Sequence, residues 1–265
     1  MSSVLTIAGF DPSSGAGVTA DLMVFAAHRL FGTACITSLT VQSTLGVAAS
    51  HPVAAETIRA TLDHLVADLP PSGIKLGMLA DASAVAAVAD FLLDLQSQHP
   101  NIPIILDPVL RSSSGRELLD PDGLALLRSR LLPLVTCITP NLDELAALTC
   151  LPVTVRADMS HAAQRLQATC PKLTILVTGG HLDPPDDLLL TPDGQPHWLP
   201  GQHIASRSTH GTGCALSSAL LSRLVLGDSP LAAAQAAKHY VAQAIRSAVS
   251  IGQGKGPLNH LWPLQ

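Results

Sequence analysis

Strand-like apolar runs alternate with alanine- and leucine-rich helical runs along most of this chain, and that order constrains the fold more than any other feature. A short β-branched run followed by a turn and a helix-length stretch is typical of βαβ units. Such units build a mainly parallel sheet with helices on both faces. The strand-like runs are Val4–Ala8, Cys35–Val41, Gly73–Met78, Pro103–Asp107, Val135–Thr139 and Leu173–Thr178. No linker or repeat interrupts the alternation, so we predict one α/β domain over residues 1–265.

Helices are predicted where apolar residues recur with a period of about 3.6 residues. They cover Thr19–Leu30, Glu56–Ala67, Asp120–Leu132, Asn141–Leu148, Asp158–Ala168, a stretch from Gly211 to about Leu226, Pro230–Ser250, and a long helix that Asp81 or Ser83 caps and that runs to about Gln98. Asp187–Leu190 and Gln195–Leu199 predict a hairpin around Pro192-Asp-Gly194. Gly46–Val53 fits either a partner strand or a loop.

Composition excludes several classes of protein. Only 13% of the residues are charged and the formal net charge is −5, so nothing attracts the chain to a polyanion and we expect no nucleic-acid partner. No run of eighteen apolar residues occurs and Val4–Gly9 is too short for a signal peptide, so we expect no membrane span. The five cysteines are widely spaced without a CxxC pair, which indicates reduced thiols in a cytoplasmic protein.

In open parallel sheets a ligand binds at the carboxyl ends of the strands. This rule directs attention to the loops that follow the predicted strands, where glycines and polar residues are concentrated. The loops are Gly9–Gly17, Gly77-Met78, Asp107–Arg111, Pro140–Glu144, Gly179–His181 and the turn that enters the helix at Gly211. We expect the ligand site to be built from these segments.

The turn Ser208-Thr-His-Gly-Thr-Gly-Cys214 opens a predicted helix with two glycines. These glycines let backbone N–H groups approach an anion, and the helix N-terminus adds about half a positive charge. Gly211, Thr212 and Gly213 are therefore candidates for binding a phosphate or a migrating phosphoryl group. Cys214 lies in the first turn, where we expect a lowered thiol pKa and a role as base toward a substrate hydroxyl. A glycine cap and a small buried cysteine would explain the same residues.

Asn141 and Glu144 follow the strand-like run that ends at Thr139. Their spacing matches a capping box, in which Asn141 caps the helix and Glu144 occupies its third position. The same two side chains, together with Asp107 at the end of another strand, would alternatively hold Mg²⁺ through water beside a nucleotide. The residues alone leave both interpretations open.

The stretch from Gly9 to Asp21 contains a GxGxxA pattern at Gly15–Ala20. A dinucleotide site is disfavoured, because these glycines come too long after the strand and no acidic residue stands about twenty positions later. A Walker A motif is absent as well. Asp21 is either a polar contact for a substrate or a charge in the first helical turn.

The sequence gives weaker evidence for a functional role of Gln42 and Lys238. Gln42 follows a strand-like run, and its amide would suit a heteroaromatic ring that has both a donor and an acceptor. Lys238 lies in the last predicted helix, and we interpret it as part of a solvated face.

Several segments together resemble the hydroxymethylpyrimidine and phosphomethylpyrimidine kinases of thiamine biosynthesis. The segments are Ala8–Asp21, Leu39–Gln42, Lys75–Met78, Leu106-Asp107, Thr139–Asn141 with Glu144, Gly179–His181 and Thr209–Cys214. The resemblance implies a ribokinase-like fold with a small β lid, and ATP with Mg²⁺ as the phosphoryl donor. It also implies phosphorylation of 4-amino-5-hydroxymethyl-2-methylpyrimidine and then of its monophosphate.

The resemblance further implies roles for individual residues. The pyrimidine would lie near Ala16, Asp21, Val41, Gln42, Met78 and Val109. The nucleotide would be bound by Asn141, Thr178, Gly180 and His210, and Mg²⁺ by Asn141, Glu144 and Asp107. Cys214 takes the place of the catalytic aspartate of ribokinase, with the amides of Gly211, Thr212 and Gly213 as the anion hole. A homodimer formed through residues near 34–53 is expected on the same basis.

Two positions depart from the family pattern. Phe10 stands near the substrate loop, where the family usually has a smaller polar residue, Thr or Ser. The family commonly has Lys-Gly-Gly-His where this chain has Thr178-Gly-Gly-His181, so Thr178 offers a hydroxyl but no charge to a nucleotide phosphate. Two rival functions remain. One is a pyridoxine or pyridoxal kinase, which shares the fold and acts on a similar ring alcohol, and the other is a non-catalytic relative that binds ligands.

Overall fold

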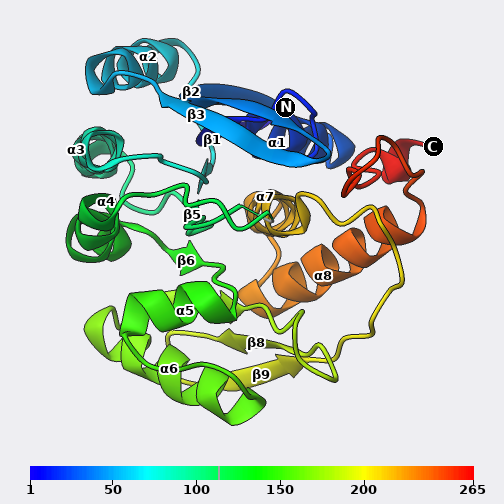
Figure 1. Ribbon diagram of the computed structural model, residues 1–265. Coiled ribbons are helices and arrows are strands. Elements are labelled where there is room, and N and C mark those ends of the chain that lie inside the picture. The colour runs from blue at the N-terminus through cyan, green and yellow to red at the C-terminus, as the bar shows by residue number, and fades with distance from the viewer. Residues whose placement is uncertain (113) are drawn as a thin grey trace.

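A computed structural model describes residues 1–112 and 114–265 (Figure 1). It contains a nine-stranded sheet in the order β3-β2-β1-β4-β5-β6-β7-β8-β9. The strands are β1 (Ser3–Phe10), β2 (Phe31–Ser43), β3 (Gly46–Pro52), β4 (Ile74–Leu76), β5 (Ile104–Leu106), β6 (Cys137–Ile138), β7 (Thr174–Val177), β8 (Asp187–Leu190) and β9 (Pro196–Leu199). The α-helices are α1 (Gly17–Ala27), α2 (Ala55–Asp68), α3 (Ala82–Gln98), α4 (Pro121–Leu126), α5 (Leu142–Thr149), α6 (Arg156–Thr169), α7 (Thr212–Val225) and α8 (Pro230–Arg246). In the described residues no helix is both long and apolar enough to cross a membrane.

The order of the strands creates a crevice at the middle of the sheet. β1, β2, β4, β5, β6 and β7 pair in parallel, whereas β3, β8 and β9 are antiparallel and lie at the two edges. From β1 the chain passes to β2 on one side and then returns to form β4 on the other side. This reversal is a topological switch point, which opens a crevice at the carboxyl ends of β1 and β4. Residues 46–52 form β3 and pair with the end of β2, with Thr40 opposite Ser50.

Helices cover both faces of the sheet, and each face has its own apolar core. One face packs against α2 to α6, and the other packs against α1, α7 and α8 (Figure 1). Alternate residues of a strand point to opposite faces, so Ile104 and Leu106 of β5 enter the first core and Ile105 enters the second. β5 is therefore apolar on both sides, as the sequence predicts for a strand of a covered parallel sheet. The predicted α/β fold is confirmed.

The predicted helix over Asp120–Leu132 is interrupted. After α4 the chain forms a π turn at Leu127–Leu131 and a 3-10 turn at Leu132–Leu134. Pro133 accounts for this change, because proline has no N–H to donate and its ring collides with the carbonyl group four residues earlier.

The last helix ends earlier than the sequence predicts, at the point where the C-terminal segment returns to it. α8 ends at Arg246 rather than near Ser250. The N–H of Asn259 donates to the carbonyl oxygen of Ala244 at 3.1 Å. The returning chain thus satisfies a carbonyl group at the helix end, which would otherwise remain without a partner.

A buried ion pair lies beneath the carboxyl ends of the central strands. Lys75 of β4 contacts both carboxylate oxygens of Asp21 of α1, at 2.9 and 3.0 Å, and neither side chain is exposed. Asp21 also accepts hydrogen bonds from Thr6 of β1 at 2.6 Å and from Ser218 of α7 at 2.7 Å. One carboxylate therefore joins two strands and two helices around the switch point.

Lys75→Met should destabilise the protein by about 3–5 kcal/mol, because it leaves the carboxylate of Asp21 buried without a counter-charge. Urea unfolding followed by circular dichroism measures the free energy of unfolding. The control is the double variant Lys75→Met with Asp21→Asn, which removes both charges and should recover most of the loss. A single variant as stable as the wild type would show that the pair does not hold these elements together.

Candidate active site

One large cavity opens at the carboxyl edge of the sheet, with a volume of about 1680 Å³. The loops after β1, β4, β5, β6 and β7, the start of α7 and part of α8 contribute to its wall. A small-molecule site typically occupies about 300–1,000 Å³. The cavity therefore has room for two ligands, as a group-transfer reaction requires.

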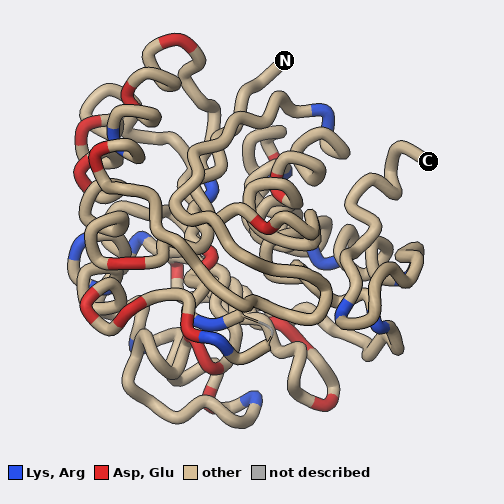
Figure 2. The backbone as a smooth tube through the Cα atoms, turned by 45° about the horizontal axis from the view of Figure 1, so that its top comes forward, with Lys and Arg blue, Asp and Glu red and all other residues tan. Residues whose placement is uncertain are grey.

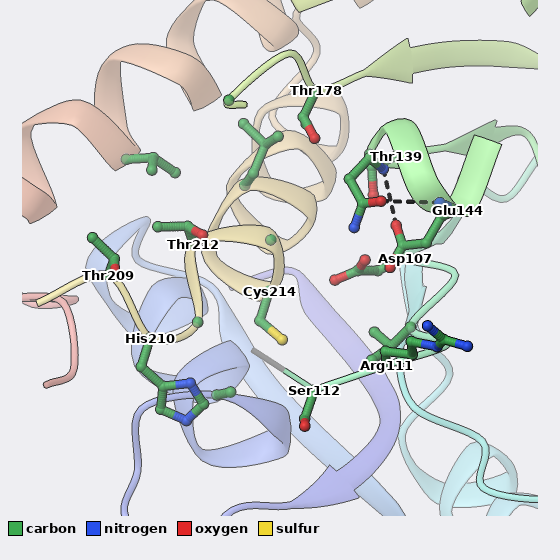
Figure 3. Close-up of a pocket in the computed structure, with 18 of the residues that line it drawn as sticks. Asp107, Arg111, Ser112, Thr139, Glu144, Thr178, Thr209, His210, Thr212 and Cys214 are labelled. Atoms are coloured by element: carbon green, nitrogen blue, oxygen red, sulfur yellow. Dashed lines mark hydrogen bonds between the residues drawn. The ribbon is translucent and has the colours of Figure 1, made fainter. Parts of the chain in front are cut away.

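The start of α7 lies in the wall of this cavity, where Figure 3 labels Thr212 and Cys214. Gly211 is the N-cap residue, and no side chain caps the helix. This position requires glycine, because φ is +87° and a Cβ atom would overlap the carbonyl oxygen of Gly15. The first N–H groups of a helix have no intrahelical partner, and Thr212, Gly213 and Cys214 lie beside the cavity. The geometry fits an anion at this point.

Asp11 organises the loop between β1 and α1. Its carboxylate accepts hydrogen bonds from the N–H and hydroxyl of Ser13, at 2.8 and 2.7 Å, and from the N–H of Ala16 at 2.9 Å. His210 Nε2 lies 2.7 Å from the same carboxylate and 3.0 Å from the side-chain amide of Gln42. Burial acts to raise the pKa of Asp11, but the hydrogen bonds from His210 and Ser13 outweigh it and lower the pKa. The contacts tie this loop to the end of β2 and to the turn before α7.

Asp107 and Glu144 are two buried carboxylates in the cavity wall. Burial raises the pKa of Asp107 to about 6, against the opposing charge of Lys75. Burial and then the charge of Asp107 raise the pKa of Glu144 to about 8. The predicted capping box is confirmed: Asn141 Oδ1 accepts from the N–H of Glu144 at 3.0 Å, and Glu144 accepts from the N–H of Asn141 at 2.9 Å (Figure 3).

These carboxylates fit a magnesium ion that is held partly by water. In the part of the chain that the structure describes, no three His, Cys, Asp or Glu side chains are grouped around a common metal position. Mg²⁺ keeps several water ligands, however, and needs only one or two carboxylates beside nucleotide phosphates. The repulsion between Asp107 and Glu144 is the kind that a bound cation relieves. The capping box does not exclude this role, but it already engages the side chain of Asn141.

The predicted lowering of the Cys214 pKa is wrong for this structure. Burial raises the pKa of the Cys214 thiol to about 12. The charge of Lys75 opposes the rise, and the charges of Asp107 and Asp21 add to it. The expectation considered only the helix N-terminus, whereas the thiol is partly buried in the cavity wall and lies near the charges of Asp107 and Asp21. The thiol is therefore neutral near pH 7.

Most of the predicted site residues line this one cavity. They are Ala16, Gln42, Met78, Asp107, Val109, Asn141, Glu144, Thr178, Gly180, His210, Gly211, Thr212, Gly213 and Cys214. Two predicted substrate contacts lie elsewhere. Asp21 is fully buried, so it supports the wall through Lys75 and does not face a ligand. Val41 is 53% exposed on β2 and lies outside the cavity wall.

Two further residues lie in places that the sequence did not predict. His210 was assigned to the nucleotide, but it contacts Asp11 and Gln42, on the side of the predicted pyrimidine contacts. Lys238 was interpreted as part of a solvated face, but it lines the cavity and pairs with Asp187 at 2.7 Å. In both cases the partner is remote in sequence, so no local pattern identified it.

Sequence analysis also missed Lys75 and Arg111, which line the cavity. A signal for Lys75 existed: a lysine inside the apolar run Gly73–Met78 must find a buried counter-charge if the run is a central strand. Arg111 follows β5 on an exposed loop and pairs with Glu117 at 3.3 Å. Nothing in its local sequence separates it from an ordinary surface arginine.

The neutral thiol of Cys214 gives a prediction about reactivity. In a Cys150→Ser, Cys170→Ser background, Cys214 is the only cysteine that is not buried. Because thiolate is the reactive form, its alkylation by iodoacetamide should be slow at pH 7 and rise about tenfold per pH unit up to at least pH 10. Mass spectrometry of the modified peptide measures the rate. The urea-unfolded chain is the control and should level off near pH 8.5 or slightly above. If the alkylation rate of the folded protein instead levelled off below pH 8, the lowered thiol pKa predicted from the sequence would be correct.

Comparison with known proteins identifies the family of the chain. A profile of the phosphomethylpyrimidine kinase family matches residues 11–259. The chain is 42% identical over 261 residues to a hydroxymethylpyrimidine/phosphomethylpyrimidine kinase of Synechococcus elongatus, covering 98% of this chain and 97% of that protein. A protein of the same name from Escherichia coli is 39% identical over 262 residues, covering 97% and 96%.

Two solved structures are similar over nearly the whole chain. A phosphomethylpyrimidine kinase from Clostridium difficile superposes with a TM-score of 0.79 at 31% identity, covering 92% of this chain and 100% of that one. A pyridoxal kinase from Bacillus subtilis, solved as an ADP complex, has a TM-score of 0.88 at 28% identity and covers 100% of both chains. The family profile and the relatives near 40% identity decide between the two names: the chain belongs to the phosphomethylpyrimidine kinase family and has its ribokinase-like fold.

Proposed function

We propose that the protein transfers the γ-phosphoryl group of ATP to 4-amino-5-hydroxymethyl-2-methylpyrimidine, and then to the resulting monophosphate, in the biosynthesis of thiamine diphosphate. One kinase domain over residues 1–265 carries both reactions. The observation that carries the proposal is the uncapped start of α7, whose amides face a cavity large enough for two ligands. Family membership supports the choice of acceptor, because the relatives are named for it.

Phosphoryl transfer depends on positioning and charge stabilisation more than on covalent chemistry. The amides of Gly211, Thr212 and Gly213 bind the oxygens of the migrating group, with the positive end of the α7 dipole behind them. When bound at the phosphates, Mg²⁺ neutralises charge on their oxygens. Asp107 and Glu144 are the residues that would hold the ion, together with water.

The two ligands occupy opposite sides of this anion site. The pyrimidine lies against Ala16, Gln42, Met78 and Val109, and the nucleotide lies against Asn141, Thr178 and Gly180. The amide of Gln42 suits a ring that carries an amino group beside a ring nitrogen, because it offers both a donor and an acceptor. The position of Gln42 supports this arrangement, because its side chain lines the cavity and its amide nitrogen lies 3.0 Å from His210 Nε2.

Cys214 is the proposed acceptor of the alcohol proton in the first reaction. The charge of Asp107 is one reason why its thiol stays neutral, and a cation held by Asp107 weakens that repulsion and favours the thiolate. Asp107, with a pKa of about 6, is another wall residue that can take up a proton near pH 7.

We further propose a cytoplasmic homodimer that binds neither membranes nor nucleic acid. The β2–β3 hairpin forms an edge of the sheet and exposes Leu39, Val41 and Leu45, which a second copy would cover. Lys and Arg are scattered among Asp and Glu in Figure 2, which supports the lack of a polyanionic partner. Sedimentation equilibrium measures the assembly state, and a monomeric wild-type chain would contradict the dimer.

The rival substrate is pyridoxal or pyridoxine. Several pyridoxal kinases share the fold, including that of Staphylococcus aureus with a TM-score of 0.86 at 28% identity in its ADP complex. Their substrate also carries a hydroxymethyl group on a six-membered nitrogen ring. The identity to these enzymes is lower than to the pyrimidine kinases, which favours the pyrimidine.

ADP release should show a higher kcat/KM with the hydroxymethylpyrimidine than with pyridoxal or pyridoxine. Gly211→Ala should lower kcat by roughly a hundredfold or more, because a side chain there displaces the amides from the anion. Gly227→Ala is the matched control, since Gly227 also has positive φ but nothing lies within 4 Å of the added Cβ. Turnover with pyridoxal alone would assign the rival function, and no turnover with either alcohol would contradict a kinase.

Cys214→Ala should slow phosphorylation of the alcohol more than phosphorylation of the monophosphate. An alcohol must lose its proton as the new bond forms, whereas a phosphate acceptor is already ionised near pH 7. Single-turnover rates on both substrates measure the two losses. Equal losses, or none, would refute the base role, and Asp107→Asn would then be the variant to compare.

A further inference from the structure

Lys238 of α8 lies in the cavity wall beside the turn that follows β7. Its Nζ is 2.7 Å from a carboxylate oxygen of Asp187 and 3.2 Å from the carbonyl oxygen of Pro185. The other carboxylate oxygen of Asp187 accepts a hydrogen bond from the N–H of Gly179 at 2.9 Å. The Lys238–Asp187 pair therefore holds an ammonium group against the Gly179-Gly180 turn.

The ammonium group of Lys238 still has a donor for a ligand. It carries three N–H donors, and the contacts to Asp187 and Pro185 use two of them. The Lys238 side chain is 22% exposed. A ligand oxygen at the Gly179-Gly180 turn can therefore accept the third hydrogen bond without breaking the ion pair.

The distribution of charge in the wall favours such a contact. Asp107 and Asp187 both lie in the wall, and a nucleotide brings several more negative charges into the cavity. Thr178 offers only a hydroxyl at the turn, and Lys75 is fully buried in its own ion pair. Lys238 supplies positive charge at a place where the strand ends do not.

We propose that Lys238 is a nucleotide-binding residue that donates a hydrogen bond to a phosphate oxygen at the Gly179-Gly180 turn. This inference rests on the proposed function, because it names a group that binds the phosphoryl donor. Asp187 is the counter-ion that offsets part of the charge of Lys238 before the nucleotide enters. A purely structural pair would instead join α8 to β8 without touching a ligand.

Isothermal titration of the full-length protein with ADP in the presence of Mg²⁺ tests this proposal. Lys238→Met should raise the Kd for ADP by roughly tenfold or more, the usual effect of losing one charge-assisted hydrogen bond. The Kd for adenosine, which has no phosphate, should stay close to the wild-type value.

Asp187→Asn is the matched control. It removes the ion pair but keeps the charge of Lys238 and an oxygen for the N–H of Gly179, so ADP should bind as in the wild type or more tightly. If the pair were only structural, Asp187→Asn and Lys238→Met would weaken ADP and adenosine alike. That result, or wild-type affinity of Lys238→Met for ADP, would overturn the proposal.

A second variant adds the charge back from the other side of the turn. Thr178→Lys in the Lys238→Met background should recover part of the ADP affinity, because it returns a positive charge to the turn. If Lys238→Met alone does not fold, its combination with Asp187→Asn leaves no unpaired charge and carries the same expectation for ADP. Failure of the proposed function is separate: a wild-type protein that binds ADP but phosphorylates no pyrimidine would show it.

Discussion

The buried pair of Lys75 and Asp21 is the interaction on which the arrangement of the site depends. Asp21 receives hydrogen bonds from β1 and α7 as well as the charge of Lys75 on β4. The two strands at the switch point and the helix that carries the anion site are thereby fixed to the same carboxylate. Taking two charges out of water is costly, and hydrophobic residues of similar size often replace such pairs without loss of stability. Here the pair is better explained by position: it sets where α7 begins relative to the strand ends.

The same charges determine the electrostatics of the cavity. Lys75 acts on both Asp107 and Cys214, opposing the pKa rise that burial causes in each. Burial raises the pKa of both Asp107 and Glu144, and the charge of Asp107 adds to the rise at Glu144, so the wall is poised to accept a cation. Perturbed carboxyl groups of this kind gather at functional sites more than elsewhere, because the fold must tolerate their cost. The cavity is consequently suited to a nucleotide that arrives with a divalent ion.

Sequence reasoning predicted the fold and the glycine turn that starts α7 for a shared physical reason, because both depend on local sequence patterns. Strand and helix periods are short, and the glycine at position 211 is required by a backbone conformation within its own turn. The predictions that failed concern residues whose partners are distant in the sequence. Asp21 and Lys75 are 54 residues apart, and His210 and Asp11 are 199 apart, so only the order of the strands brings them together. The wrong prediction of the Cys214 pKa has the same origin. The helix terminus is visible in the local sequence, whereas the burial that raises the pKa depends on the whole fold.

The use of backbone amides also explains how one site can serve two successive reactions. In the proposed mechanism, amides at the start of α7 recognise the oxygens of the migrating phosphoryl group, and these oxygens are the same whether the acceptor is an alcohol or a phosphate monoester. The two acceptors differ instead in charge and in whether a proton must leave. In this proposal a side chain such as Cys214 accepts the proton of the alcohol, while a cation at the wall would offset the negative charge of the phosphate groups. In the proposed mechanism these three tasks are divided among a helix end, a thiol and a wall that holds a cation, so the protein can accept its own first product as its second substrate.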